Sequence, residues 1–150
     1  SVLLLKELGY TKIGLIGASL GGMTALLYAT LCDLMDFVFV VVPAVNLTEN
    51  LMPTKKSFDF EITDEMKAMT KEVVQLITPE NYTPKLPIEK IGGVVHAGDK
   101  LNDAELTRAW AQKWGVTTLT EIPGGHWVYG NKKEKGRAWY NWLKEFNFIS

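Results

Sequence analysis

The sequence lacks a charge excess, a second cysteine and a long hydrophobic run, and each absence excludes a class of protein. Its 16 lysines and arginines nearly balance its 17 aspartates and glutamates, so the net charge of -1 gives no electrostatic footprint for nucleic acid. No stretch reaches the roughly 18 apolar residues of a membrane-spanning helix. The single cysteine, Cys32, cannot form an internal disulfide, which fits a reducing compartment. We therefore expect a cytoplasmic protein.

A secretory leader is also lacking. The apolar stretch at 2–5 has neither a basic segment before it nor a small-residue cleavage site after it. It is better explained as the last turns of a helix that ends at Gly9, because glycine commonly follows a helix C-terminus. A chain that begins inside a helix looks cut from a longer one, so we expect a natural N-terminus upstream of Ser1.

What the sequence does contain is a regular alternation of strands and helices. The expected strands are 12–17, 37–42, 91–97 and 116–122, and the expected helices are 2–8, 20–32, 103–114 and 132–146. The first three strands are near-continuous apolar runs, which is typical of strands covered on both faces of a parallel sheet. The sequence therefore predicts an α/β three-layer sandwich with a mostly parallel sheet of about four strands. We expect one domain over residues 1–150, interrupted by an insertion at 43–90.

The insertion contains one further helix with a clear beginning. Thr63 can cap it, and acidic residues follow in its first turn, where they favour the helix dipole. Four apolar residues recur along this helix at helical spacing: Met66, Met69, Val73 and Leu76. Core packing is the expected role of such a stripe, although the position of the helix between two strands also allows a lid over a site.

A glycine-rich turn joins the first strand to the helix that follows it. Residues 17–22 read Gly-Ala-Ser-Leu-Gly-Gly, which places Ser19 at the apex of a sharp strand–turn–helix. We expect Gly17 and Gly21 to approach so closely that side chains at either position would clash. We also expect a strained backbone at Ser19, and a close approach of the helix to the sheet at Gly22.

The spacing of this turn, G-x-S-x-G, is that of a nucleophile elbow. In such a turn the backbone N–H of Leu20 would be one donor of an oxyanion hole, because a helix N-terminus stabilises negative charge. The turn also resembles the dinucleotide-binding turn of short-chain dehydrogenases, and Tyr129 and Lys133 offer that family's Y-x-x-x-K spacing. However, the last glycine comes one position early and too few strands follow. A phosphate-binding P-loop is excluded, because no lysine follows the glycines at the required place.

A serine nucleophile needs a base and an acid that orients it. Of the two histidines, His96 lies in an apolar strand and is expected to be buried with a local hydrogen bond, whereas His126 lies in a glycine-rich loop directly after a strand. That loop belongs to the carboxyl edge of the sheet, where open α/β sheets keep their sites. Asp99 lies in the first turn after strand 91–97. Asp103 starts the next helix, where capping is its ordinary role, so Asp99 is the better acid and Asp103 the alternative.

Three segments in this order resemble the C-terminal half of an α/β-hydrolase: the elbow at 17–22, the turn Val94-Val95-His96-Ala97-Gly98-Asp99, and the loop Gly124-Gly125-His126. The resemblance implies a serine hydrolase of the carboxylesterase kind, acting on an ester or related acyl substrate through an acyl-enzyme. It implies Ser19 as nucleophile, His126 as base and Asp99 as acid, with no cofactor and no metal. Many relatives have one or two more residues before the aspartate, which keeps Asp103 open.

The resemblance covers a truncated fold. In that family the elbow follows the fifth strand of eight, whereas here it follows the first, so the early strands and the loop that supplies the second oxyanion donor are missing. The remaining strands would be neighbours in one sheet, with strand 12–17 at its edge. Because that edge is apolar and carries no protecting lysine or proline, we expect a homo-oligomer that pairs through it. Two functions follow: a serine hydrolase, or a catalytically weak hydrolase fragment that acts as a self-associating module.

Overall fold

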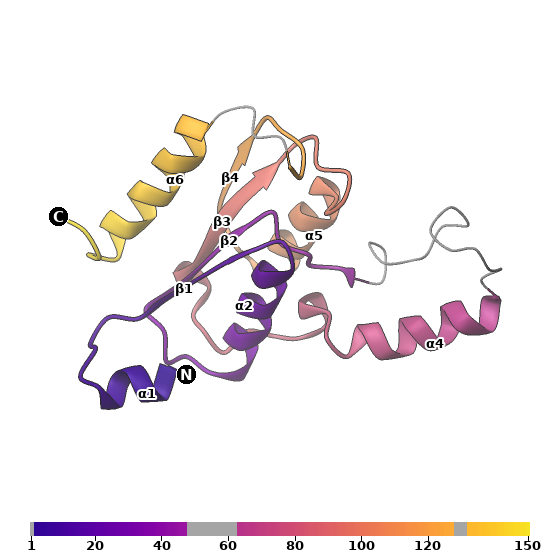
Figure 1. The fold of residues 1–150 in the computed structure, drawn as a ribbon, viewed down its shortest axis with the longest axis horizontal. Helices are drawn as coiled ribbons and strands as arrows, with labels where there is room; N and C mark the ends of the chain where they lie inside the picture. The colour runs from indigo at the N-terminus through magenta and orange to yellow at the C-terminus, as the bar shows by residue number, and fades with distance from the viewer. Residues whose placement is uncertain (1, 48–62, 128–131) are drawn as a thin grey trace.

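The computed structural model describes residues 2–47, 63–127 and 132–150 (Figure 1). The elements are α1 (Val2–Glu7), β1 (Gly14–Ala18), α2 (Leu20–Leu31), β2 (Phe37–Val41), α4 (Asp64–Gln75), η1 (Pro79–Asn81), η2 (Ile88–Lys90), β3 (Ile91–His96), α5 (Ala104–Trp114), β4 (Thr118–Ile122) and α6 (Lys132–Glu145). Each predicted strand and helix is present, with its ends moved by no more than two residues.

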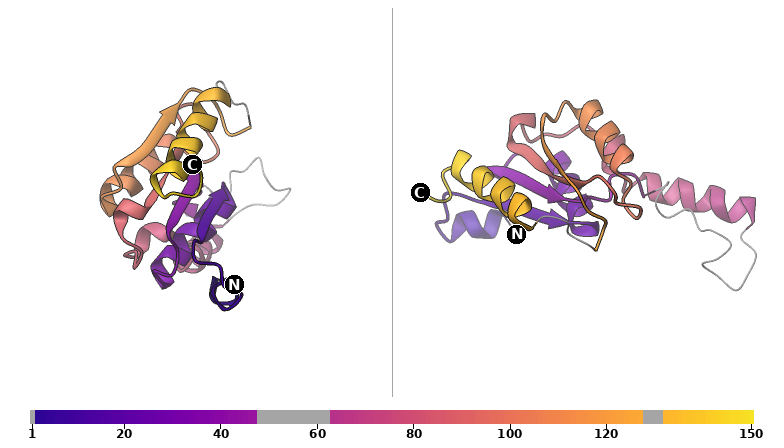
Figure 2. Two further views of the ribbon diagram at one scale, coloured as in Figure 1. Left: turned by 90° about the vertical axis from the view of Figure 1, so that its left-hand side faces the viewer. Right: turned by 90° about the horizontal axis from the view of Figure 1, so that it is seen from above.

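The four strands form one sheet in the order β1-β2-β3-β4, and every neighbouring pair is parallel. Helices α2 and α5 cover one face of this sheet and α6 covers the other (Figures 1 and 2). The predicted three-layer α/β architecture is therefore confirmed. Because all four strands are parallel, their carboxyl ends meet at one edge, and the turns that follow them lie beside one another.

The two faces of the sheet have separate cores because successive side chains of a strand point to opposite faces. On the α2 and α5 side, Val38 and Val40 pack with Leu26 and Trp110. On the α6 side, Phe37 lies at the centre of an aromatic cluster whose ring centroids are 4.9 to 6.4 Å from its own: Trp139, Trp142, Phe146 and Phe148. β2 is thus buried on both faces, as its continuous apolar sequence predicted.

β1 departs from that expectation. Only Gly17 of its five residues is buried, and Ile16 is 53% exposed. The reason is the place of β1 at the edge of the sheet, since α6 packs on residues of β2, β3 and β4. Among the described residues β1 pairs only with β2. The prediction that this strand is covered on both faces is wrong.

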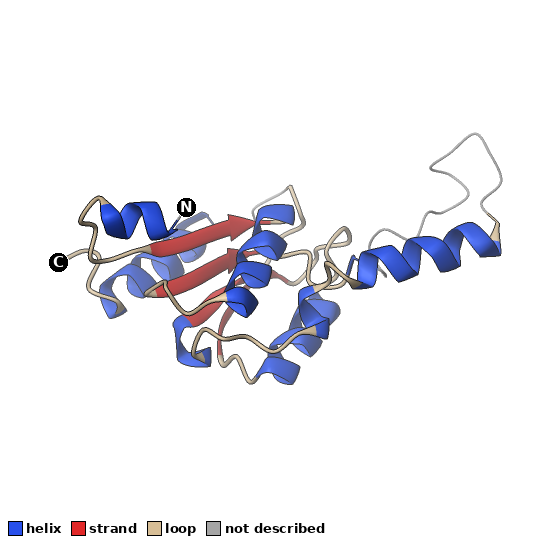
Figure 3. Ribbon diagram, turned by 90° about the horizontal axis from the view of Figure 1, so that it is seen from below, coloured by secondary structure: helices blue, strands red, loops and turns tan. Residues whose placement is uncertain are grey.

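The helix of the insertion is present as α4, and the Thr63 hydroxyl caps it by accepting a hydrogen bond from Met66 N at 3.2 Å. The predicted core stripe of this helix is nevertheless exposed: Met66 40%, Met69 62%, Val73 64% and Leu76 64%. Figure 3 shows the reason, because α4 extends away from the sheet and only its C-terminal end reaches the body. The core assignment is therefore wrong. A lid role remains a prediction, and residues 48–62 of the insertion lie outside the described part of the chain.

This exposure predicts that Met69→Gln changes the free energy of unfolding by less than about 0.5 kcal/mol, because surface substitutions away from special features have small effects. Met35 is a matched control, since it is a methionine with only 1% of its surface exposed. Met35→Gln should destabilise by about 2 kcal/mol or more, because it buries an amide among apolar groups. Denaturant unfolding measures both variants. Equal losses would contradict the exposed position of α4.

Candidate functional site

Ser19 alone joins β1 to α2, because the strand ends at Ala18 and the helix begins at Leu20. Its backbone has φ 52° and ψ -119°, a conformation that residues with a side chain rarely adopt. Hydrogen bonds hold it there: Ser19 N donates to Val41 O at 2.9 Å, and Ser19 O accepts from Ala44 N at 3.1 Å. The strain predicted at the apex is confirmed, and the neighbouring strand end stabilises it.

The glycines around Ser19 differ in how much space a side chain would have. A Cβ atom on Gly17 would lie 2.1 Å from Gly21 O, which is backbone and cannot move aside. A Cβ on Gly22 would lie 2.9 Å from Pro43 Cβ, so Gly22 lets α2 approach the turn after β2. A Cβ on Gly21 would meet nothing within 4 Å. The predicted clash is confirmed for Gly17 and wrong for Gly21, which contributes its backbone to the contact.

Asp99 and His126 form a buried pair at the carboxyl edge of the sheet. Asp99 lies in the turn after β3 and His126 in the loop after β4, and His126 Nδ1 is 2.8 Å from Asp99 Oδ2. The two residues are 2% and 7% exposed. A hydrogen bond of 2.9 Å from Gly98 N to Gly124 O ties the two loops together. Parallel pairing of β3 with β4 therefore brings the predicted base to the predicted acid.

The contacts of the carboxylate set the tautomer of the imidazole. Asp99 Oδ1 accepts hydrogen bonds from Leu101 N and Asn102 N, both at 2.9 Å, which leaves Oδ2 for the histidine. An ionised carboxylate only accepts, so the proton of neutral His126 belongs on Nδ1 and its Nε2 is left as an acceptor. The Trp127 ring stands edge-on to this imidazole with centroids 4.7 Å apart.

The competing residues have structural roles. The Asp103 side chain caps α5 by accepting from Glu105 N at 2.7 Å, which is the ordinary role expected of it. His96 is fully buried, and its Nδ1 lies 2.9 Å from Gly125 O, so it holds the loop that leads to His126. Of the dehydrogenase-like pair, Tyr129 lies outside the described residues.

Sequence reasoning missed Asn102, which is 4% exposed and touches the elbow. Its Nδ2 donates to Val42 O at 2.7 Å and lies 3.4 Å from Ser19 Oγ. In the sequence Asn102 is one polar residue in a turn before a helix cap, and nothing local distinguishes it. Only the approach of the turn after β3 to the elbow reveals these contacts.

The backbone N–H of Leu20 belongs to the first turn of α2. The first N–H groups of a helix have no acceptor within it, and the helix dipole adds partial positive charge at this end. Leu20 directly follows Ser19, and its side chain is 59% exposed. A negative charge that develops beside Ser19 would therefore lie near the N–H groups that begin α2.

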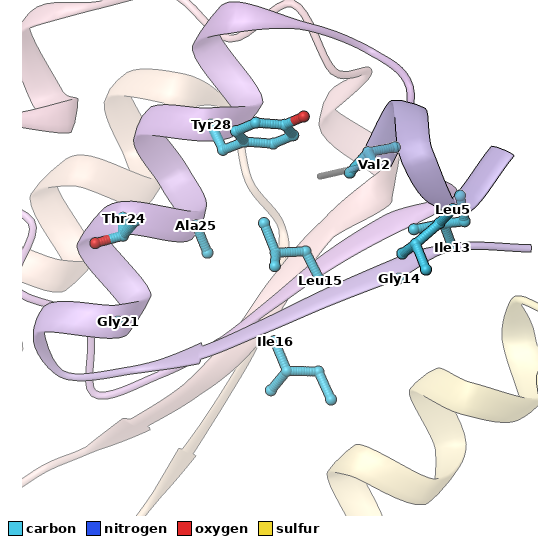
Figure 4. Close-up of a pocket in the computed structure, with 10 residues that line it drawn as sticks. All are labelled: Val2, Leu5, Ile13, Gly14, Leu15, Ile16, Gly21, Thr24, Ala25 and Tyr28. Atoms are coloured by element: carbon cyan, nitrogen blue, oxygen red, sulfur yellow. The ribbon is translucent and has the colours of Figure 1, made fainter. Parts of the chain in front are cut away.

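An apolar groove of about 540 Å³ runs along β1, between α1 and α2 (Figure 4). Its lining includes Leu5, Ile13, Leu15 and Tyr28. A hydrogen bond with the Cys32 side chain raises the pKa of the Tyr28 phenol, which is un-ionised at neutral pH even at its ordinary pKa. The groove marks the uncovered flank of the edge strand, and it is lined by neither Asp99 nor His126.

Residues 2–47, 63–127 and 132–150 contain no group of three or more His, Cys, Asp or Glu side chains that could hold a metal ion. Within the same ranges, no helix combines the length and apolar character needed to cross a membrane.

No family model matches the chain. Two curated proteins, each an uncharacterized protein from a strain of Mycobacterium tuberculosis, are 31% identical to it over 118 residues. The match covers 76% of this chain and 28% of either protein. The chain thus spans little more than a quarter of the length of these relatives.

Solved structures with a similar fold cover nearly the whole chain. Est1E from Butyrivibrio proteoclasticus, solved with ferulic acid, has a TM-score of 0.70 at 17% identity and covers 99% of this chain and 67% of its own. A monoacylglycerol lipase from Paleococcus ferrophilus has a TM-score of 0.61 at 20% identity. Its match covers 96% of this chain and 72% of its own. An alpha/beta hydrolase from the metagenome of lagoon sediments has a TM-score of 0.61 at 16% identity. Its match covers 97% of this chain and 67% of its own. The predicted fold class is confirmed.

Proposed function

We propose that this chain, which has the α/β-hydrolase fold, is a serine hydrolase that acts on an ester or related acyl substrate. The observation that carries the proposal is the buried pair of His126 Nδ1 and Asp99 Oδ2, 2.8 Å apart, at the same sheet edge as the strained Ser19. A base oriented by a buried carboxylate activates the hydroxyl of a serine on a strand–helix turn when the two come within hydrogen-bond reach.

In the first half of the proposed reaction, Ser19 Oγ forms a bond to the carbonyl carbon of the substrate. His126 Nε2 takes the proton that the hydroxyl gives up, and Asp99 stabilises the imidazolium without taking the proton itself. The carbonyl oxygen becomes an oxyanion, and the N–H of Leu20 donates to it.

In the second half, the bond between the carbonyl carbon and the leaving group breaks, and His126 returns the proton to the departing alcohol. Water then attacks the acyl group on Ser19 while His126 takes a proton from that water. The bond from the acyl carbon to Ser19 Oγ then breaks, His126 gives its proton to Ser19 Oγ, and the carboxylic acid is released. Every proton passes through His126, which explains why its orientation by Asp99 matters.

The rate of this chain should be low for the fold. Among residues 2–47, 63–127 and 132–150 we identify only Leu20 as an oxyanion donor, and loss of one donor of such a hole slows catalysis by about 10²- to 10³-fold. Covalent labelling is therefore a better assay than turnover, because it needs only one reaction at the serine.

A fluorophosphonate probe tests the proposal. Attack by Ser19 Oγ on phosphorus expels fluoride and leaves a stable adduct, which peptide mass spectrometry locates. We expect the adduct on Ser19 in the folded chain and none in the Ser19→Ala control or after heat denaturation. A folded chain that acquires no adduct, or acquires it on another residue, is not a hydrolase of this kind.

A second candidate function is self-association through β1. It is supported by the side of that strand that pairs with no other described strand, by the 53% exposure of Ile16 and by the apolar groove beside it. An edge strand of this kind is a template for pairing with another chain, and a lysine on it discourages such pairing.

This candidate predicts that the chain is an oligomer in light scattering and that Ile16→Lys converts it to a monomer. Val73→Lys is the matched control, because Val73 is a similarly exposed aliphatic residue at 64% on the distant α4. We expect it to leave the oligomer intact. A monomeric wild-type chain at high concentration contradicts the candidate.

A further inference from the structure

We propose that Asn102 is a positioning residue for Ser19, whose hydroxyl it holds through its side-chain amide while its backbone holds the acid of the site. This inference rests on the proposed function. Asn102 is placed for both tasks in the turn between β3 and α5, where it is 4% exposed.

The orientation of the Asn102 amide follows from its partner. Val42 O can only accept a hydrogen bond, so the group 2.7 Å from it must be the NH₂ of the amide and not its oxygen. The same nitrogen lies 3.4 Å from Ser19 Oγ and directs its second N–H to that oxygen. The shorter bond anchors the amide, and the longer one leaves the serine oxygen room to move toward a substrate.

The anchor is itself a strained point of the backbone. Val42 has φ 43°, a left-handed conformation that is unusual for a β-branched residue. Its N–H donates to Val94 O at 2.8 Å and its carbonyl accepts from Asn102, so both of its polar groups are held. The turn that follows supports the elbow directly, since Ala44 N donates to Ser19 O at 3.1 Å. Asn102 thus stabilises the backbone on which Ser19 rests as well as its hydroxyl.

The two parts of Asn102 can be separated by mutation. Its backbone N–H donates to Asp99 Oδ1 at 2.9 Å, and any residue except proline keeps that donor. Its side-chain amide donates hydrogen bonds to Val42 O and Ser19 Oγ, and substitution removes both. A side-chain variant therefore leaves the acid in place and releases the nucleophile.

The Asn102 amide also orients the hydroxyl proton of Ser19. A hydroxyl has one proton to donate and two lone pairs that accept. With one lone pair of Ser19 Oγ facing the Asn102 N–H, the proton of the hydroxyl points elsewhere and is free for the base. Loss of the amide lets the hydroxyl rotate among positions, most of which are unproductive, so the chemical step slows while probe binding does not change.

The experiment measures the maximal labelling rate of Ser19 by a fluorophosphonate and the apparent dissociation constant of the probe, each in the full chain. We expect Asn102→Ala and the isosteric Asn102→Asp, which lacks the donors, to lower the maximal rate by about 10- to 100-fold. The dissociation constant should stay within about twofold, because the changed contacts are to the serine and not to the probe. Asn81→Ala is the matched control, since that exposed amide donates to Gln75 O at 2.9 Å on another part of the chain, and it should change neither value.

A purely structural role would show differently. It would lower the melting temperature and the fraction of chain that is labelled, but the folded fraction would react at the wild-type maximal rate. That result, or a change in the dissociation constant alone, overturns the inference. If wild-type chain is labelled at Ser19 and the variants react equally fast, the positioning role is wrong and the proposed function stands. Wild-type chain without an adduct on Ser19 overturns both.

Discussion

Asp99→Asn should slow fluorophosphonate labelling of Ser19 by about 10⁴-fold with little change in stability. Asparagine keeps the shape of the side chain, and its amide oxygen can still accept from Leu101 N and Asn102 N as Asp99 Oδ1 does. The group facing His126 Nδ1 then becomes a donor, so the imidazole must carry its proton on Nε2 and cannot accept one from the serine. An amide in place of the orienting carboxylate has this magnitude of effect in serine hydrolases. The labelling rate over several hours, with the melting temperature beside it, measures the change.

Asp103→Asn is the matched control in the same turn. Asp103 caps α5, and asparagine caps helices about as well as aspartate, so both the fold and the labelling rate should be retained. The two substitutions make the same chemical change four positions apart. A loss of labelling in the Asp103 variant with none in the Asp99 variant would reverse the assignment of the acid.

Gly17→Ala should destabilise the chain by about 3 kcal/mol or more and abolish labelling of Ser19. The added Cβ would lie 2.1 Å from Gly21 O and 2.4 Å from Gly21 C, far inside van der Waals contact. Those atoms belong to the first turn of α2, so relief requires the helix to move away from the strand. Denaturant unfolding measures the loss, and fluorophosphonate labelling reports whether the turn at Ser19 survives in the fraction that folds.

Gly21→Ala is the matched control, with an effect of opposite sign. A Cβ there meets nothing within 4 Å, and Gly21 lies within α2, where alanine is favoured over glycine by roughly 0.5–1 kcal/mol. We therefore expect a small gain in stability and unchanged labelling. Equal losses in the two variants would mean that the strand and the helix do not cross at Gly17 as described.

Much of the fold could be predicted because its determinants are local. The continuous apolar sequence of β2 and β3 indicated strands buried on both faces, and Thr63 marked the beginning of α4. Ser19 could be singled out for the same reason, since a turn of one residue between strand and helix imposes its own backbone conformation. The order of Ser19, Asp99 and His126 then matched the order expected for a known family.

Where the sequence misled, the missing information was which surface each element meets. The methionines of α4 have the spacing of a core stripe, but the helix extends away from the sheet and leaves them exposed. Ile16 is as apolar as its neighbours on β2, but β1 lies at the sheet edge, and the buried cluster beneath α6 is built on β2, β3 and β4. A periodic pattern shows which side of a helix or strand is apolar enough to be buried. Whether that side is buried depends on which other elements pack against it.

By itself the sequence determined the strands and helices, the strained turn at Ser19 and the candidate site residues, because these depend on steric preferences over a few neighbouring positions. The tertiary structure decided that Asp99, and not Asp103, faces His126, and that Asn102 reaches Ser19 across 83 positions of sequence. Such contacts depend on the parallel order β1-β2-β3-β4, which brings the turns after separate strands to one edge. Strand order and register arise from the packing of the whole chain, and no short segment encodes them.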